Sequence, residues 1–124
     1  MVVDWRSYCR ANDFDIEGDA VLVDLPGNRV QRVSIHDEQD VYLLTSIVAR
    51  AAVVAEIDTL PFQVWERNRG TELLGFKIDT RGRLIGEAWV SKAGLTGSEF
   101  TTYLHAVASE CDRFEYQLTG LDAS

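Results

Sequence analysis

Hydrophobic and polar residues alternate most clearly between Leu73 and Trp89, where the pattern predicts two strands joined by a tight turn. Asp79-Thr80-Arg81-Gly82 is a turn sequence, and Gly82 occupies the position where a left-handed residue closes a three-residue loop. Pairing Asp79 with Arg83 places one apolar set on the face that we expect to be buried, namely Leu74, Phe76, Ile78, Leu84, Gly86 and Ala88. The opposite face mixes charges with three large apolar side chains, which are Leu73, Ile85 and Trp89.

These three apolar side chains have two possible partners. Another element of the same chain can cover them, as is common for aromatic residues in small domains. Alternatively they contact a second protein chain, because exposed apolar patches surrounded by charge mark interaction sites. We therefore take Leu73, Ile85 and Trp89 as candidate contact residues for a dimer or a partner, with Trp65 as a fourth candidate.

The segment after this hairpin predicts a long helix with a strong start. Thr96 suits the N-cap position, and Glu99, three residues later, completes a capping box. Apolar residues then recur at spacings of three and four along one helical face: Phe100, Tyr103, Leu104, Val107, Cys111, Phe114 and Leu118. A stripe of this kind most often belongs to the core, and Gly120 is expected to end the helix.

The first part of the chain predicts a short helix followed by strands. Asp4 caps the helix, which carries Trp5, Tyr8 and Cys9 on one side. Because the helix is short, it needs packing for its stability. The predicted order is then a turn at 15–19, a strand at 20–25, a turn at 26–28, a return strand at 29–36 and an acidic loop at 37–40.

Residues 41–54 are compatible with two structures. Their nearly continuous apolar run is typical of a buried central strand. The same run also fits one face of a helix, and periodicity alone does not choose between the two (Leu44, Ile47, Val48 and Ala51 share that face). We favour a strand to about Arg50, followed by a loop through Ala55.

A second helix is predicted after that loop. Asp58 or Thr59 caps it, Pro61 lies in its first turn, where the missing N–H is harmless, and Gly70 closes it. The 124 residues therefore predict one α+β domain over 1–124 in the order α-β-β-β-α-β-β-α, with helices packed on an antiparallel sheet.

Charge and composition exclude several classes of partner. The formal net charge is −8, which disfavours nucleic acid and anionic membranes, because both require a basic surface. The same charge suits a basic or unfolded protein segment. No apolar run reaches the length of a membrane span, and no signal-peptide pattern is visible, so we expect a cytoplasmic protein.

No residue pattern indicates a catalytic, metal or cofactor site. His36 and His105 have no second ligand at one-turn spacing. Cys9 and Cys111 lack the Cys-x-x-Cys spacing of redox and zinc sites, so we expect two buried thiols. Glycine-rich patterns that bind phosphates or dinucleotides are absent as well. We therefore expect no catalytic residue, no cofactor and no metal.

Three stretches of the sequence resemble the type III secretion chaperone-like fold, in its YbjN-like branch. They are WERNRG at the end of the middle helix, the hairpin GFKIDTRGRLIGEAWV, and the entry LTGSEF into a final helix that closes with CDRFEYQL. The resemblance covers the architecture of nearly the whole chain, and none of its motifs is a functional residue. It implies a small, acidic, often dimeric binding module that holds an extended segment of a protein client. Pro61 and the long connection at 47–58 depart from the pattern.

Three hypotheses about function follow. The first is a non-enzymatic protein-binding or chaperone-like module that forms a homodimer and binds an unidentified protein client. The second is a regulatory domain that senses a small ligand in an apolar pocket; such a ligand would raise the melting temperature. The third is an enzyme that uses dispersed carboxylates, which a cleft holding paired carboxyl groups of raised pKa would favour.

Overall fold

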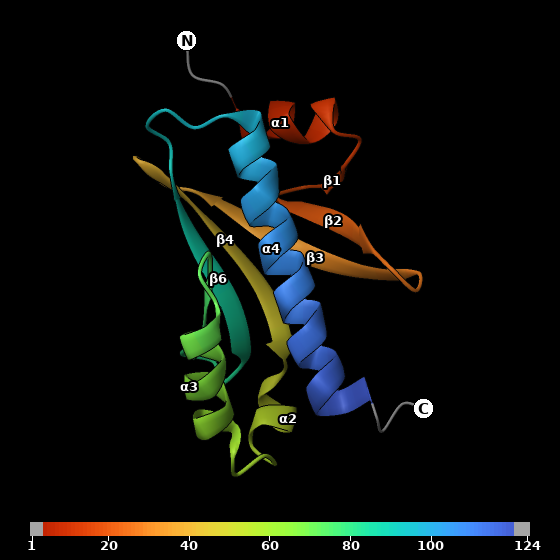
Figure 1. Ribbon diagram of the computed structural model, residues 1–124, viewed down its shortest axis with the longest axis vertical. Coiled ribbons are helices and arrows are strands. Elements are labelled where there is room, and N and C mark those ends of the chain that lie inside the picture. Colours follow the sequence, from red (N-terminus) through yellow and green to blue (C-terminus); the bar gives the residue numbers. More distant parts are fainter. Residues whose placement is uncertain (1–3, 121–124) are drawn as a thin grey trace.

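The computed structural model describes residues 4–120, which form a six-stranded antiparallel sheet with α1 and α4 packed on one face (Figure 1). The strand order is β1-β2-β3-β4-β6-β5. The strands are β1 (Asp15–Glu17), β2 (Ala20–Leu25), β3 (Arg29–Asp37), β4 (Val41–Ala49), β5 (Gly75–Ile78) and β6 (Leu84–Ser91). The helices are α1 (Trp5–Ala11), α2 (Ala51–Val54), α3 (Leu60–Gly70) and α4 (Gly97–Glu115), and the π-helical turn η1 (Tyr116–Gly120) continues α4. The predicted α+β class with an antiparallel sheet is confirmed.

The hairpin of β5 and β6 has the predicted register. Phe76 pairs with Gly86, and the Asp79 N–H donates to the Arg83 carbonyl at 2.8 Å. Gly82 has a φ of 78°, in the left-handed region that glycine adopts without steric cost. The Asp79 carboxylate also accepts the Arg83 N–H at 2.9 Å, so a side chain stabilises the turn as well.

Helix α4 begins at the predicted capping box. The Thr96 hydroxyl accepts the Glu99 N–H at 3.1 Å, and the Glu99 carboxylate accepts the Thr96 N–H at 3.1 Å. The predicted apolar stripe is buried at Phe100, Leu104, Val107, Cys111 and Phe114. The α-helical part ends at Glu115, and the expected stop at Gly120 is the end of η1 instead.

The core lies between this stripe and the inner face of the sheet. Alternate strand residues point inward and are buried, among them Val21, Val23, Val33, Ile35, Leu44, Val48, Leu84 and Val90. Phe76 meets Phe114 edge to face, with ring centroids 5.0 Å apart. Helix α1 adds Trp5 and Cys9 and lies against α4, where the Tyr8 and Phe100 rings are 5.4 Å apart. Helices α1 and α4 cover one face of the sheet and do not cover the other face.

Gly86 is the point of closest approach between α4 and the sheet. A Cβ atom at this position would lie 2.3 Å from the Cys111 sulfur and 3.2 Å from the Phe76 ring. Only a residue without a side chain leaves room for both neighbours. The glycine therefore sets how deeply α4 seats against β6.

Two short elements differ from the sequence prediction. Residues 15–17, expected within a turn, form strand β1, because the apolar Ile16 packs on the core while the acidic residues beside it face solvent. The loop expected after Arg50 contains the single helical turn α2, whose Val53 and Val54 also pack on the core. The ambiguous run at 41–49 is strand β4, which pairs with β3 on one side and β6 on the other. Within residues 4–120, no helix is both long enough and apolar enough to cross a bilayer.

Candidate functional site

The strands present a second set of side chains, on the face turned away from α1 and α4, which we call the open face. Its members on the four central strands are Leu22, Asp24, Val30, Arg32, Ser34, His36, Leu43, Thr45, Ile47, Ile85, Glu87 and Trp89. Among these, Val30, Ile47 and Trp89 remain 55%, 48% and 56% exposed. The described elements therefore leave large apolar side chains on this face accessible to a partner.

Apolar cross-strand pairs run along the open face between β4 and β6. Leu43 lies opposite Trp89, and Ile47 lies opposite Ile85. Pairs of this kind stabilise the sheet itself. Because Trp89 and Ile47 stay about half exposed, they also supply apolar surface that a second chain can bury.

Strands β3 and β4 are paired from Asp37–Tyr42 to Ser34–Thr45 and not beyond. Figure 1 shows the two strands diverging. Side chains fill the gap between the two backbones. The Gln31 Nε2 donates to the Ser46 hydroxyl at 2.7 Å and to the Ile47 carbonyl at 3.2 Å. The Ser46 hydroxyl in turn donates to a backbone carbonyl of β3 at 2.7 Å. These bonds satisfy backbone groups that a continuous ladder would have paired.

A hollow of about 490 Å³ opens on the open face at this split. Val30, Ile47 and Ile85 are its apolar lining, and Glu115 of α4 also lines it. Burial raises the pKa of the Glu115 carboxyl, the nearby Asp112 raises it further, and Arg29 partly opposes the two. The rest of the lining is polar or basic and consists of Gln31, Arg32, Ser34, His36, Thr45, Ser46 and Arg83. The hollow thus combines three aliphatic side chains with polar groups and, in Glu115, one carboxyl group.

The basic side chains around the hollow already have partners in the chain. Arg32 pairs with Glu17 across the sheet. The Arg83 guanidinium lies 2.8 Å from the Asp79 carboxylate. Burial alone would raise the pKa of Asp79, but hydrogen bonds from Arg83 and the Arg81 N–H lower it below its usual value. Each of the two guanidinium groups on the rim is therefore paired with a carboxylate, and His36 is the remaining basic residue of the lining.

A second apolar surface lies on α3, and we call Phe62, Trp65 and Arg69 the α3 stripe. Phe62 and Trp65 are 59% and 54% exposed, with ring centroids 5.7 Å apart. The Arg69 guanidinium lies 4.9 Å from the Trp65 ring centroid, which is a cation–π distance. Figure 1 places α3 at the end of the molecule opposite α1.

The four candidate contact residues from the sequence lie in three different parts of the structure. Trp89 lies exposed on the open face, and Ile85 lies on the same face but is only 7% exposed. Strand β5 begins at Gly75, so Leu73 lies before the strand and is not on the sheet face that the sequence pattern predicted for it. Trp65 belongs to the α3 stripe. Whether any of them contacts another chain stays a prediction.

Sequence reasoning missed three residues of the open face and its hollow. Val30 and Ile47 alternate with inward-facing neighbours, so their strand period could have placed them on the outer face. Glu115 gave no such signal, because α4 brings it to the split only in the folded chain.

The thiols and histidines do not form a reactive centre in the described residues. Burial raises the pKa of Cys9 to about 11 and that of Cys111 to about 12, so both thiols are protonated and poor nucleophiles at neutral pH. Both are free and buried, as predicted. His36 lies 3.2 Å from a hydroxyl of β4, and His105 packs on an aromatic ring. Between residues 4 and 120, no three histidine, cysteine or acidic side chains are grouped to hold a metal ion.

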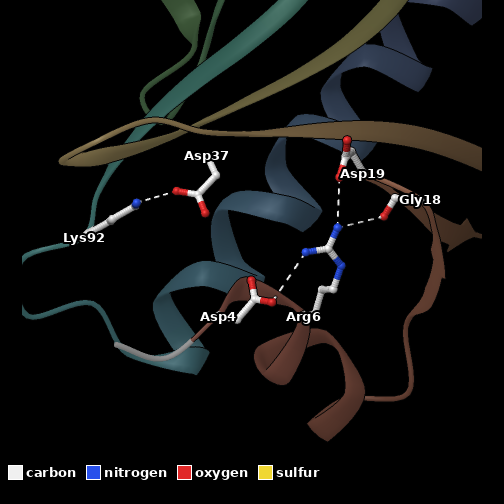
Figure 2. Close-up of polar contacts among 6 residues, drawn as sticks. All are labelled: Asp4, Arg6, Gly18, Asp19, Asp37 and Lys92. Atoms are coloured by element: carbon white, nitrogen blue, oxygen red, sulfur yellow. Dashed lines mark hydrogen bonds and ion pairs between the residues drawn. The ribbon is translucent and has the colours of Figure 1, made fainter. Parts of the chain in front are cut away.

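Charged pairs near α1 join neighbouring segments rather than forming a site (Figure 2). Arg6 donates to the Asp19 carboxylate at 2.9 Å and to the Gly18 carbonyl at 3.3 Å, which ties α1 to the turn between β1 and β2. Lys92 pairs with Asp37, which ties the end of β6 to the end of β3. Exposed pairs of this kind contribute little individually.

Sequence comparison gives no relative: no protein-family model matches the chain, and no curated protein matches it. Solved structures match over most of its length. A chain of the ExsC–ExsE complex is 18% identical with a TM-score of 0.58, over 84% of this chain and 80% of that one. The Yersinia pestis type III secretion chaperone SycH, solved with a stable fragment of YscM2, is 7% identical with a TM-score of 0.55, over 89% and 95%.

The HopA1–SchA chaperone–effector complex gives the same result, with 7% identity and a TM-score of 0.58 over 88% of both chains. At these identities the likeness shows the fold. The resemblance to the type III secretion chaperone-like fold is therefore confirmed as a fold, and the YbjN-like branch stays a prediction.

Proposed function

We propose that the protein is a non-enzymatic, chaperone-like module that binds an extended segment of a partner protein on its open face. The observation that carries this proposal is the row of half-exposed apolar side chains at Val30, Ile47 and Trp89. The comparisons support the proposal, because solved structures of the same fold include a chaperone–effector complex and a chaperone bound to a protein fragment. The stretches WERNRG and LTGSEF support placing the chain in the YbjN-like branch.

An extended segment suits the open face because its apolar side chains are spread over three strands. Val30, Ile47 and Trp89 come from β3, β4 and β6, so a segment that runs across the strands can bury all three. Burying the exposed half of each contributes about 1 kcal/mol. Ordering the segment opposes this gain, so we expect modest affinity for any one stretch. The net charge of −8 favours encounter with basic segments.

A homodimer contact is proposed on the α3 stripe. Two antiparallel copies of α3 related by a twofold axis near Trp65 would bring Arg69 of one copy beside Phe62 of the other. This arrangement buries both exposed rings and offers each guanidinium an aromatic face. It leaves the open face free, because α3 lies beside α4, where Arg67 is 4.4 Å from the Phe114 ring centroid.

Substitutions on the open face test the proposal directly. We expect Ile47→Ser and Trp89→Ser each to weaken binding of a basic unfolded probe, reduced and carboxamidomethylated lysozyme, by about fivefold, because each removes about 1 kcal/mol of apolar burial. Fluorescence anisotropy of the labelled probe measures the affinity, and circular dichroism checks the fold.

The matched control is Tyr116→Ser, which removes a half-exposed aromatic ring that belongs to η1 and not to the open face, and that lies 5.4 Å from the Arg29 guanidinium. It should bind the probe as the unmodified protein does. Equal affinity of all four proteins for the probe would reject the open face as the binding surface.

A further inference from the structure

Glu115 differs from the other acidic residues in the last two turns of α4. Asp112 lies 2.8 Å from Arg29, and Glu110 lies 3.0 Å from Arg113. Among the described residues, by contrast, the carboxylate of Glu115 takes part in no hydrogen bond or ion pair, although it is half-buried. A carboxylate withdrawn from water without a paired cation costs stability. A cation supplied from outside the chain would remove that cost.

The hollow in front of Glu115 has the shape and chemistry of a particular kind of side chain. The aliphatic residues Val30, Ile47 and Ile85 form part of its walls beside polar and basic side chains, and its volume of about 490 Å³ exceeds that of one long side chain. Lysine and arginine combine an aliphatic stem with a cationic end, so the stem can lie along the walls while the charge reaches a carboxylate. The rim guanidiniums oppose such a ligand only weakly, because Arg32 and Arg83 are paired with Glu17 and Asp79.

We propose that the hollow at the split between β3 and β4 is an anchor site for a lysine or arginine side chain of the bound segment, with Glu115 as its counter-ion. This inference rests on the proposed function, because it requires the segment to lie on the open face. It adds the chemistry of the partner: an extended stretch in which a basic residue enters the hollow and apolar residues lie on either side. Charge complementarity agrees, since the chain carries a net charge of −8.

The test uses a labelled synthetic peptide that alternates valine and threonine around a central lysine, and a second peptide with norleucine in its place. Norleucine keeps the aliphatic stem and removes the charge. We expect the unmodified protein to bind the lysine peptide about tenfold more tightly, as measured by fluorescence anisotropy, since a hydrogen bond between charged groups is worth that factor. Glu115→Gln should remove this preference.

Two further measurements distinguish an anchor from a structural role. Glu115→Gln should unfold at the same or a higher urea concentration, because it removes an unpaired charge from a half-buried position. By NMR titration, the pKa of Glu115 should fall when the lysine peptide binds, because a nearby cation favours the carboxylate. The norleucine peptide should leave that pKa unchanged.

Asp24→Asn is the matched control, since it removes one negative charge from an exposed position on the same face. It should keep the preference for lysine. A preference that survives Glu115→Gln, no preference in the unmodified protein, or no binding of either peptide each overturns the anchor site. Ile47→Ser separates the two proposals: if it weakens both peptides equally while no lysine preference exists, the open face stands and the role of Glu115 fails.

Discussion

Gly86 shows how much of the packing depends on a single position. Its missing side chain admits the Cys111 sulfur, which would lie 2.3 Å from an added Cβ, and that sulfur is carried by a long, well-packed helix. We therefore expect Gly86→Ala to lower the free energy of unfolding by about 1–3 kcal/mol, as overpacked cores do. Urea unfolding followed by circular dichroism measures the change.

A double-mutant cycle identifies the clashing atom. Cys111→Ala removes the sulfur, so Gly86→Ala should cost less in that background than in the unmodified protein. Gly70→Ala is the control, because an added Cβ there meets nothing within 4 Å. An equal cost of Gly86→Ala in both backgrounds would show that the sulfur is not the obstacle.

Single residues were predictable from the sequence where their role depends on near neighbours. Two examples are the capping pair of Thr96 and Glu99 and the left-handed conformation of Gly82. Each depends only on residues within one turn, and the structure has both. The sequence pattern placed Gly86 correctly on the buried face. The reason why a glycine is required there is the Cys111 sulfur, which belongs to another element. Glu115 likewise reaches the hollow only because α4 crosses the split between β3 and β4.

At the scale of elements, α3 closes the outer edge of β5. The Asn68 carboxamide accepts the Phe76 N–H at 2.7 Å and donates to the Phe76 carbonyl at 3.0 Å. The Thr71 hydroxyl donates to the Leu74 carbonyl at 2.9 Å. These side chains take the place of a neighbouring strand, and unpaired strand edges are sites of unwanted association.

We expect Asn68→Ala to expose this edge. The Phe76 amide should then exchange with solvent faster, and the protein should associate through β5 as its concentration rises, as light scattering would show. Adding Ile78→Lys should suppress that association, because a charge on an edge strand discourages pairing. Association that persists with the lysine would indicate general unfolding instead, and an unchanged Phe76 amide would contradict the role of Asn68.

The main elements were predictable because their apolar periods are long, as in α4, or end at clear turns, as in β2 and β3. Strand β1 was missed because three residues give too short a pattern, and two of them are acidic. The separation of β3 from β4 had no local signal. It depends on Gln31 and Ser46 meeting across the gap, and each alone fits an ordinary strand.

At the scale of the whole molecule, the two exposed apolar surfaces can make separate contacts. The open face and the α3 stripe belong to different elements, so one can hold a partner while the other joins two copies. In the dimer proposed here, each copy presents its own hollow, and a partner with two basic stretches could engage both. Binding at two linked sites raises the overall affinity for a long segment without adding a contact at either site.

Crossed substitutions test this division. Trp65→Ser should reduce the mass in light scattering from twice that of the chain to that of one chain, because it removes the ring nearest the proposed twofold axis. Trp89→Ser should leave the mass unchanged and weaken binding of the unfolded probe. If Trp89→Ser dissociates the dimer and Trp65→Ser does not, the open face is the dimer contact and the partner must bind elsewhere. A single-chain mass for the unmodified protein at all concentrations would remove the dimer while leaving the open face to be judged by peptide binding alone.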